Sequence, residues 1–309
     1  MLVDRTRENA AAETLAILRP KSTLPVALLR FCAQQPLGAF GAAVLIFAVV
    51  VAVLAPMLAP YSPTAIEVAE KFTPPFGKQI LGTDELGRDV LSRVLVAVQA
   101  SMRIAVTSVA LALVVGVAIG VLAGYRGGWL DTVLMRVVDV MFAFPVLLLA
   151  LAVVAILGPG VTTTILAIGI VYTPIFARVG RASTLGVRTE PYVRMSQAMG
   201  TGDGYILRRH ILPNISGPLI VQTSLSLAFA ILSEAALSFL GLGIQPPQPS
   251  LGRMIFDSQG FVTMAWWMAV FPGAAIFVIV LAFNLFGDGL RDVLDPKQRT
   301  TVEARRRER

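Results

Sequence analysis

Long apolar runs constrain the fold of this chain more than any other feature of its sequence. A helix needs about 20 apolar residues to cross the hydrocarbon core of a bilayer, whereas the strands of a transmembrane barrel alternate apolar and polar residues. Runs of the helical kind lie at about 37–59, 103–125, 134–157, 161–177, 217–241 and 266–286. The sequence therefore predicts an all-α integral membrane protein with six transmembrane helices.

The segments outside these runs complete the predicted organisation. Residues 1–36 form an N-terminal arm, residues 37–297 the transmembrane domain and residues 298–309 a basic tail, with a loop at 60–100 after the first span. The first run is too long for the h-region of a cleaved signal peptide and lacks a clear small-residue cleavage site. We interpret it as a retained signal anchor.

Charge asymmetry predicts the orientation in the membrane. With both termini inside, 20 of the 26 Lys and Arg residues lie on the cytoplasmic side and 5 lie outside. Positive loops favour the cytoplasmic side, so we expect cytoplasmic termini and an extracytoplasmic loop at 60–100. The basic residues flank membrane spans and follow no nucleic-acid-binding motif, which argues against nucleic acid and favours anionic lipid near the tail.

A compact polar segment between the fourth and fifth runs, residues 190–214, is called the polar island below. Pro191 fits the first position of a helix, capped by Thr189 or Glu190, and Gly200 fits its end. We expect Asp203 to cap a second short helix that Pro213 interrupts. Helices this short are marginal alone in water, where about 12 to 15 residues are usually needed. The polar island therefore needs a partner.

One face of the first island helix indicates where that partner binds. Tyr192, Met195 and Met199 lie at i, i+3 and i+7 and form an apolar stripe. This stripe contacts either another protein or the spans of this chain.

Four spaced segments carry a family resemblance. They are the polar island with its ending HILPN at 210–214, LGTDELGRDVLSR at 81–93, LSFLGLGIQPP at 237–247 and NLFGDGLRDVLDP at 284–296. Together they resemble the C-type permease subunit of the ABC importers for dipeptides, oligopeptides, glutathione or nickel, over residues 36–297. The resemblance implies a type I ABC importer permease architecture, in which residues 188–214 form a cytoplasmic coupling loop with a coupling helix.

The resemblance also implies the assembly and its location. A second homologous permease, two cytoplasmic ATPase subunits and an extracytoplasmic substrate-binding protein complete the transporter in the bacterial inner membrane. ATP and Mg²⁺ bind to the ATPase subunits, and this chain is a non-catalytic subunit without catalytic, cofactor or metal residues. The residues assigned to ATPase coupling are Tyr192, Arg194, Met195, Ser196, Met199, Gly200, Asp203, Ile211 and Pro213.

The sequence departs from the family pattern at two places, one of three residues and one of a single residue. Arg194, Met195 and Ser196 stand where the motif has Glu-Ala-Ala, and Leu251 stands where this group commonly has Trp.

The sequence itself argues against nucleotide and metal chemistry in this chain. A phosphate-binding loop needs Gly-x-x-x-x-Gly-Lys-Ser/Thr, which is absent, and the glycines at 200–204 have neither the dinucleotide spacing nor a preceding strand. The single cysteine excludes an internal disulfide and a thiol cluster, and the single histidine argues against a His-rich site.

Acidic residues within the spans are candidates for function, because a charge there is costly. Glu234 either lines the translocation path and meets a peptide ammonium group, or is neutral and hydrogen-bonded through Ser233 or Ser238, which we favour. Asp139 is expected to pair with Arg136 at i, i+3.

Two further patterns concern contacts between elements. Alternating charges at Asp84, Glu85, Arg88, Asp89 and Arg93 predict an outside helix with a solvated face. Alternatively, Asp84, Arg88, Asp89 and Arg93 seat the substrate-binding protein. Gly116 and Gly120, as Gly-x-x-x-Gly, predict close helix packing, within this chain or against a second permease.

The function predicted from these observations is a permease subunit that forms, with a second permease, the path for di- or oligopeptides. Glutathione or nickel is the alternative substrate within the same family. A proton-coupled secondary transporter with Glu234 as proton carrier, and a purely structural membrane scaffold, are the alternatives from other classes.

Overall fold

The computed structural model describes residues 32–294, so the predicted basic tail and most of the predicted N-terminal arm lie outside the described residues. Within 32–294 the regular elements are helices, and an isolated antiparallel bridge joins Thr83 to Asp89. The helices are α3 (Pro36–Leu58), α4 (Val90–Arg126), α5 (Gly128–Phe142), α6 (Val146–Leu157), α7 (Val161–Arg188), α8 (Pro191–Ala198), α9 (Asp203–Ile206), the π-helix η1 (Leu207–Ile211), α10 (Leu212–Phe239), α11 (Leu251–Ser258) and α12 (Trp267–Leu294).

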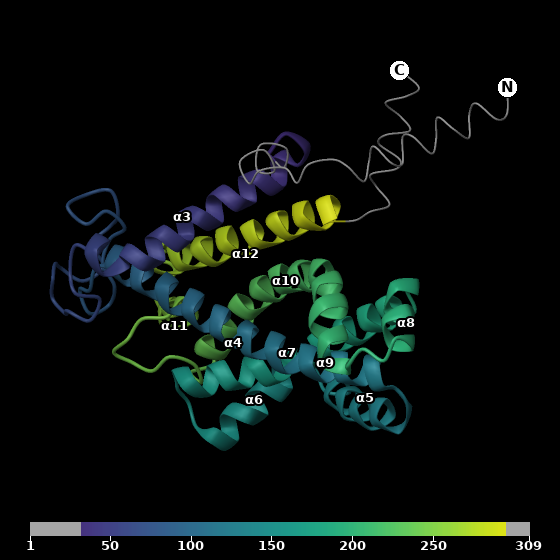
Figure 1. Ribbon diagram of the computed structural model, residues 1–309. Coiled ribbons are helices and arrows are strands. Elements are labelled where there is room, and N and C mark those ends of the chain that lie inside the picture. Colours follow the sequence, from purple (N-terminus) through teal and green to yellow (C-terminus); the bar gives the residue numbers. More distant parts are fainter. Residues whose placement is uncertain (1–31, 295–309) are drawn as a thin grey trace.

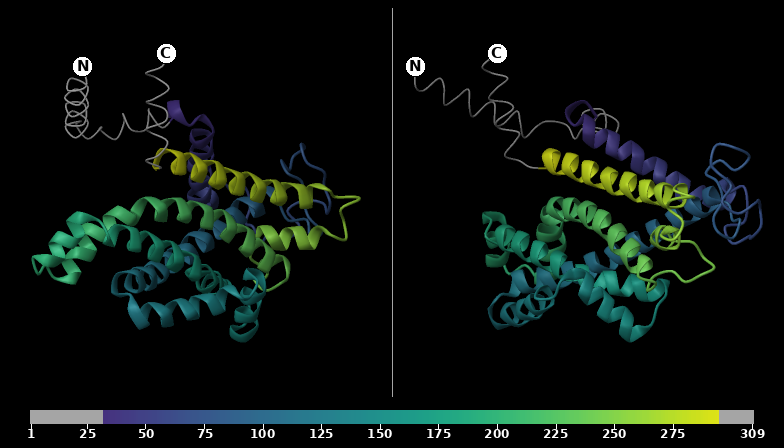
Figure 2. Two further views of the ribbon diagram at one scale, coloured as in Figure 1. Left: turned by 90° about the vertical axis from the view of Figure 1, so that its right-hand side faces the viewer. Right: turned by 180° about the vertical axis from the view of Figure 1, so that it is seen from behind.

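The long helices connect two ends of the molecule. Helices α3 and α12 lie side by side along one edge, and α4 runs diagonally away from them, beginning near the loop at residues 59–89 (Figure 1). The loop at residues 59–89 gathers at one end, and α8 and α9 lie at the other, as the turned views confirm (Figure 2). Helix α4, with 37 residues, is about 55 Å long at 1.5 Å per residue. It is long enough to reach both ends.

Five helices are long and apolar enough to cross a membrane, and a sixth span results if α5 and α6 count as one. The predicted span at 134–157 falls on two helices rather than one, because α5 and α6 meet at 91°. Pro145 lies at the break. Proline lacks an N–H donor and disfavours a helical conformation in the preceding residue, here Phe144.

Several helices extend beyond the apolar runs that predicted them. Helix α4 begins at Val90, well before the predicted span at 103–125. The prediction missed this part because polar residues in the first turns interrupt the apolar run. Helix α7 likewise continues past 177 to Arg188. The apolar run marks only the part of a helix that the bilayer can cover, whereas the hydrogen-bonded helix continues into polar sequence.

The most extensive helix packing is between α4 and α7. Gly116, Gly120 and Gly124 lie one turn apart on α4 and face the α7 backbone. A Cβ atom at Gly116 would lie 2.5 Å from the Thr173 carbonyl oxygen, and one at Gly120 would lie 2.8 Å from the Arg181 backbone nitrogen. No side chain fits at such distances. The prediction of close packing is confirmed for both glycines, and the packing lies within this chain.

This packing predicts opposite effects for two glycine-to-alanine changes. Gly120→Ala should destabilise the protein by about 1 to 3 kcal/mol, because the methyl group meets backbone atoms that cannot move aside. Gly186→Ala, the control on α7, has no atom within 4 Å of its Cβ position and should stabilise the helix by up to about 1 kcal/mol. Thermal unfolding midpoints in detergent test this contrast, and a stable Gly120→Ala protein would contradict it.

Candidate functional site

The polar island has one buried and one exposed face. Val193, Ile206 and Ile211 are fully buried and pack with Ile215 against the last turns of α4, at Val121 and Tyr125. The exposed face carries Tyr192, Met195, Met199 and Tyr205, whose residue exposures are 41%, 64%, 72% and 58%. The stripe predicted from Tyr192, Met195 and Met199 therefore does not pack against the spans of this chain. Its alternative, a contact with another protein, stays a prediction.

Local hydrogen bonds define the first island helix. Pro191 begins α8, as predicted, but no side chain caps it at the N-terminal residue Glu190. Gly200 has φ +76°, and the backbone nitrogens of Gly200 and Thr201 donate to the carbonyls of Gln197 and Ser196 at 3.0 and 3.1 Å. This is the Schellman geometry, in which glycine is favoured because its left-handed conformation costs other residues energy. The predicted end at Gly200 is confirmed.

The second island helix differs from the prediction. Asp203 does not cap it, since Gly202 holds the N-cap position. Pro213 does not interrupt the helix either, because α9 continues through η1 into α10. Pro213 falls in the first turn of α10, directly after the wide π-turn, where a missing N–H costs little.

Asp203 instead ties the polar island to α4. The Tyr125 hydroxyl donates to Asp203 Oδ1 at 2.8 Å, and Arg126 lies 3.6 Å from Oδ2. On the other side, Arg188 donates to the Gly124 carbonyl at 3.4 Å. These contacts join the polar island and the end of α7 to the end of α4.

His210 was not among the predicted site residues, although it organises the island. Its ring lies between Tyr192 and Tyr205, with centroid distances of 5.8 and 5.9 Å, and its Nε2 is 3.5 Å from the Ser196 hydroxyl. Three aromatic side chains in one short polar segment are a signal that could have indicated this cluster.

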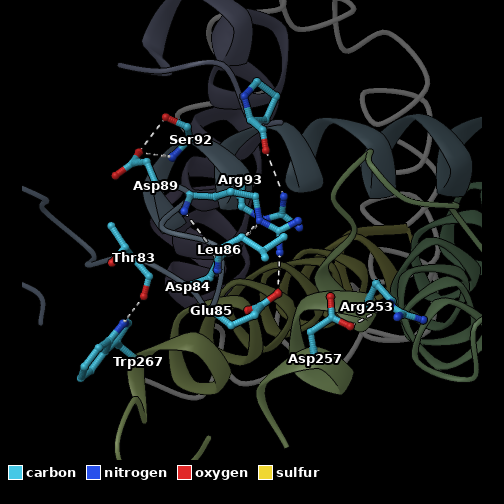
Figure 3. Close-up of polar contacts among 12 residues, drawn as sticks. Thr83, Asp84, Glu85, Leu86, Asp89, Ser92, Arg93, Arg253, Asp257 and Trp267 are labelled. Atoms are coloured by element: carbon cyan, nitrogen blue, oxygen red, sulfur yellow. Dashed lines mark hydrogen bonds and ion pairs between the residues drawn. The ribbon is translucent and has the colours of Figure 1, made fainter. Parts of the chain in front are cut away.

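At the opposite end of α4, charged residues form a buried group that we call the acid–arginine cluster: Asp84, Glu85, Arg88 and Arg93 (Figure 3). Asp84 Oδ2 accepts from Arg88 Nε at 2.6 Å and lies 3.5 Å from Arg93 Nε. Its Oδ1 accepts from the backbone nitrogens of Leu86 and Arg88, both at 2.9 Å. One carboxylate thus joins two guanidinium groups and fixes a backbone turn.

The acid–arginine cluster is buried further by its neighbours. Arg88 also donates to Glu85 at 2.7 Å, while burial, and then the charge of Asp84, raise the pKa of Glu85 above its usual range. Asp89 caps α4 by accepting from the Ser92 backbone nitrogen at 2.8 Å. Arg93 donates to the Pro63 carbonyl at 3.0 Å, which ties the start of α4 to the loop at residues 59–89.

The predicted solvated helix over these charges is wrong. Asp84, Arg88 and Asp89 precede α4 rather than lying on it, and all three are buried, as is Arg93. A period of three to four residues between opposite charges fits an exposed helix face, but also a tight turn closed by ion pairs. A direct role of these four side chains in seating a binding protein stays a prediction.

Glu234 lies in the core of the bundle with no exposed surface. The hydroxyls of Ser101, on α4, and Ser238, on α10, donate to its two oxygens at 2.5 and 2.7 Å. Of the two predicted partners, Ser238 is found, whereas Ser233 bonds to Tyr172 at 3.1 Å instead. The favoured hydrogen-bonded reading fits this geometry.

Two ion pairs hold α5 against α7. Asp139 pairs with Arg178 at 2.8 Å, so the prediction of Arg136 as its partner is wrong. Arg181 makes a bidentate pair with Asp131, at 2.5 and 2.6 Å. These partners are 39 and 50 residues apart in sequence, so neighbour spacing on one helix gave no signal for them.

An apolar cavity of 480 Å³ opens between α6, α7 and α10. Its lining residues are Val146, Leu147, Tyr172, Ile175, Phe229, Leu232, Ser233 and Ala236. The Tyr172–Ser233 hydroxyl pair supplies its polar group. Sequence reasoning did not find this cavity, since its walls come from three separate segments. Within residues 32–294, no group of three His, Cys, Asp or Glu side chains could hold a metal ion.

Two family models of transport permeases match different parts of this chain. Residues 116–300 match the family model of the binding-protein-dependent transport system inner membrane component. Residues 26–75 match the N-terminal transmembrane domain of oligopeptide transport permease C.

Curated relatives cover most of the chain. The dipeptide transport system permease protein DppC of Alkalihalophilus pseudofirmus is 40% identical, over 86% of this chain and 88% of the relative. The glutathione transport system permease protein GsiD of Pectobacterium atrosepticum is 41% identical, over 94% of this chain and 98% of the relative. The di/tripeptide transport system permease protein DppC of Pseudomonas aeruginosa is 43% identical, over 84% and 88%.

A solved structure shares the fold. A chain of the MetNI methionine ABC transporter, in inward-facing conformations, matches with a TM-score of 0.55 and 19% identity, over 65% of this chain and 96% of that chain.

Removal of the Asp84 charge from the acid–arginine cluster should lower the stability of the protein strongly. Asp84→Asn keeps an oxygen for the backbone bonds but leaves two buried guanidinium groups without their shared carboxylate. We expect a loss of about 3 to 5 kcal/mol of unfolding free energy. Glu70→Gln, an exposed carboxylate in the same loop, is the control and should change stability by less than about 0.5 kcal/mol. Equal unfolding midpoints for the two variants would contradict the role of Asp84.

Proposed function

This chain belongs to the family of binding-protein-dependent transport system inner membrane components, and from that membership we propose that it forms, with a second permease, the membrane path for di- and oligopeptides. It is a permease subunit of an ABC importer, and the predicted type I importer fold is confirmed. In this family ATP hydrolysis takes place on separate subunits. Family membership carries the proposal of a peptide path, and the apolar surface left exposed on the polar island carries the proposed coupling to an ATPase.

The proposed coupling runs from that surface to α4. Met195, Met199 and Tyr205 would enter a groove of a cytoplasmic ATPase subunit, and a second ATPase would engage the second permease. The buried island residues and the Tyr125–Asp203 bond would then carry the movement of the groove into α4. This arrangement requires the polar island, and with it both termini, to lie in the cytoplasm, as the charge asymmetry predicts.

The proposed translocation path passes the cavity between α6, α7 and α10 rather than Glu234. The cavity is open and mainly apolar, with two hydroxyl groups, which suits peptide side chains of varied size. Two relatives named for dipeptides or tripeptides support a peptide substrate. Glutathione is the second candidate, because a relative named for it matches 94% of this chain.

The loop at residues 59–89 is the proposed seat of the extracytoplasmic binding protein. Its exposed side chains include Ile66, Phe76 and Ile80, which present apolar surface at the end opposite the polar island. The acid–arginine cluster would act by holding the shape of this loop, since its own charges are buried.

If the polar island docks on an ATPase subunit, a charge introduced into its apolar surface should strongly weaken the association. Met195→Asp or Met199→Asp should weaken association with the ATPase subunits by tenfold or more, because a carboxylate would be desolvated in an apolar contact. Met264→Asp is the matched control, since Met264 is 59% exposed but lies far from the island in sequence and structure. Copurification of the ATPase subunits and transport-coupled ATP hydrolysis measure the effect. Intact association in both island variants would overturn the proposed docking.

Variants of Glu234 distinguish the proposed ATP-driven permease from a proton-coupled transporter. Glu234→Gln keeps the hydrogen bonds to Ser101 and Ser238, so peptide uptake into proteoliposomes should remain ATP-driven at an unchanged rate. Glu234→Leu leaves both hydroxyls unpaired in the core and should cost about 1 to 3 kcal/mol of stability. Uptake driven by a pH gradient without ATP, and lost in Glu234→Gln, would instead support the secondary transporter.

A further inference from the structure

The charge around the exposed apolar surface of the polar island identifies the chemistry of its partner. We propose that the ATPase groove that receives the island has an apolar floor and acidic residues at its rim, matched to Arg194, Arg208 and Arg209. This inference rests on the proposed docking of the island and specifies the surface that it meets.

The three arginines are exposed beside the apolar stripe. Arg194 precedes Met195 on α8, and Arg208 and Arg209 project from η1, next to the His210 ring that contacts Tyr192 and Tyr205. Within residues 32–294, none of the three makes an ion pair or a side-chain hydrogen bond. Their guanidinium groups are therefore available to a partner.

The acidic residues of the island do not balance this charge. Residues 188–214 contain only two, Glu190 and Asp203. Asp203 already binds Tyr125 and Arg126, whereas Glu190 is exposed at the start of α8. Arg188 is directed at the Gly124 carbonyl and the Tyr125 ring. The surface that remains is thus positive, with thioether and phenol groups at its centre.

A partner must compensate these charges as they lose water. A guanidinium group that is desolvated without an acceptor weakens binding, whereas a carboxylate can accept two parallel hydrogen bonds from it. Flexible methionines fill an irregular apolar floor well. An acidic rim around an apolar floor is therefore the surface that fits the island.

Anionic lipid offers the same charge but fits the position less well. The polar island is attached to the last turn of α4, and α4 is about 55 Å long, whereas the hydrocarbon core spans about 30 Å. This length favours a protein groove beyond the membrane surface.

The test measures binding of the purified ATPase subunits to the two-permease complex in nanodiscs of phosphatidylcholine. We expect wild-type affinity to fall as KCl rises from 50 to 500 mM, as attraction between opposite charges is screened (about 10 Å Debye length at 0.1 M). Arg194→Glu should weaken binding about tenfold at the lowest salt, with a smaller salt dependence. Arg194→Lys should retain most of the affinity, and Lys78→Glu, the same charge change at the opposite end, should leave it unchanged.

Three other outcomes would each contradict a different part of the proposal. If Arg194→Glu binds as tightly as wild type while Met195→Asp does not bind, the island docks but the groove is not acidic. If Arg194→Glu weakens binding only in nanodiscs that contain phosphatidylglycerol, the arginines contact lipid instead. If neither variant changes the affinity, the proposed docking itself fails.

Discussion

The close contact between α4 and α7 is the constraint on which the rest of the structure depends. Three glycines, one turn apart, allow the two backbones to touch where any side chain would separate them. In a bilayer, lipid tails are as apolar as the helices, so close packing and hydrogen bonds must supply the attraction between helices. Helix α7 continues within two residues of α8, and the end of α4 holds the other side of the polar island. The contact therefore fixes the frame to which the polar island is attached.

Polar contacts at three positions along α4 also hold this helix in place. Asp89 and the acid–arginine cluster hold its first turn, Ser101 and Glu234 join it to α10 in the core, and Tyr125 and Asp203 hold its last turn. The Ser101–Glu234 and Tyr125–Asp203 contacts bridge segments that are distant in sequence, whereas the ion pairs of the acid–arginine cluster are local. Bending α4 near Ser101 would break its hydrogen bond to Glu234, which is fully buried and has no water to replace that bond.

Local features of the fold could be predicted from the sequence, and long-range features could not. Pro191 and Gly200 set the bounds of α8 through backbone preferences that act over a few residues, and Gly116 and Gly120 indicated close packing. Pro213 was misread because a π-turn before it changes which N–H groups the helix needs. The pairing of Asp139 with Arg178, and the burial of Asp84, depend on which helices meet, and residue spacing along one helix carries no information about that. Pro145 was visible, but the apolar residues on both sides of it hid the bend.

The uninterrupted course of α4 also fixes a rotational relation between the two ends of the molecule. An α-helix turns about 100° per residue, so the number of residues between Asp89 and Tyr125 determines which way the loop at residues 59–89 faces relative to the polar island. Adding one residue in this interval would rotate one surface by more than a quarter of a turn, whereas adding seven would nearly restore the original direction. The length of α4 is thus a structural parameter in itself, because it sets the relative direction of the loop at residues 59–89 and the polar island.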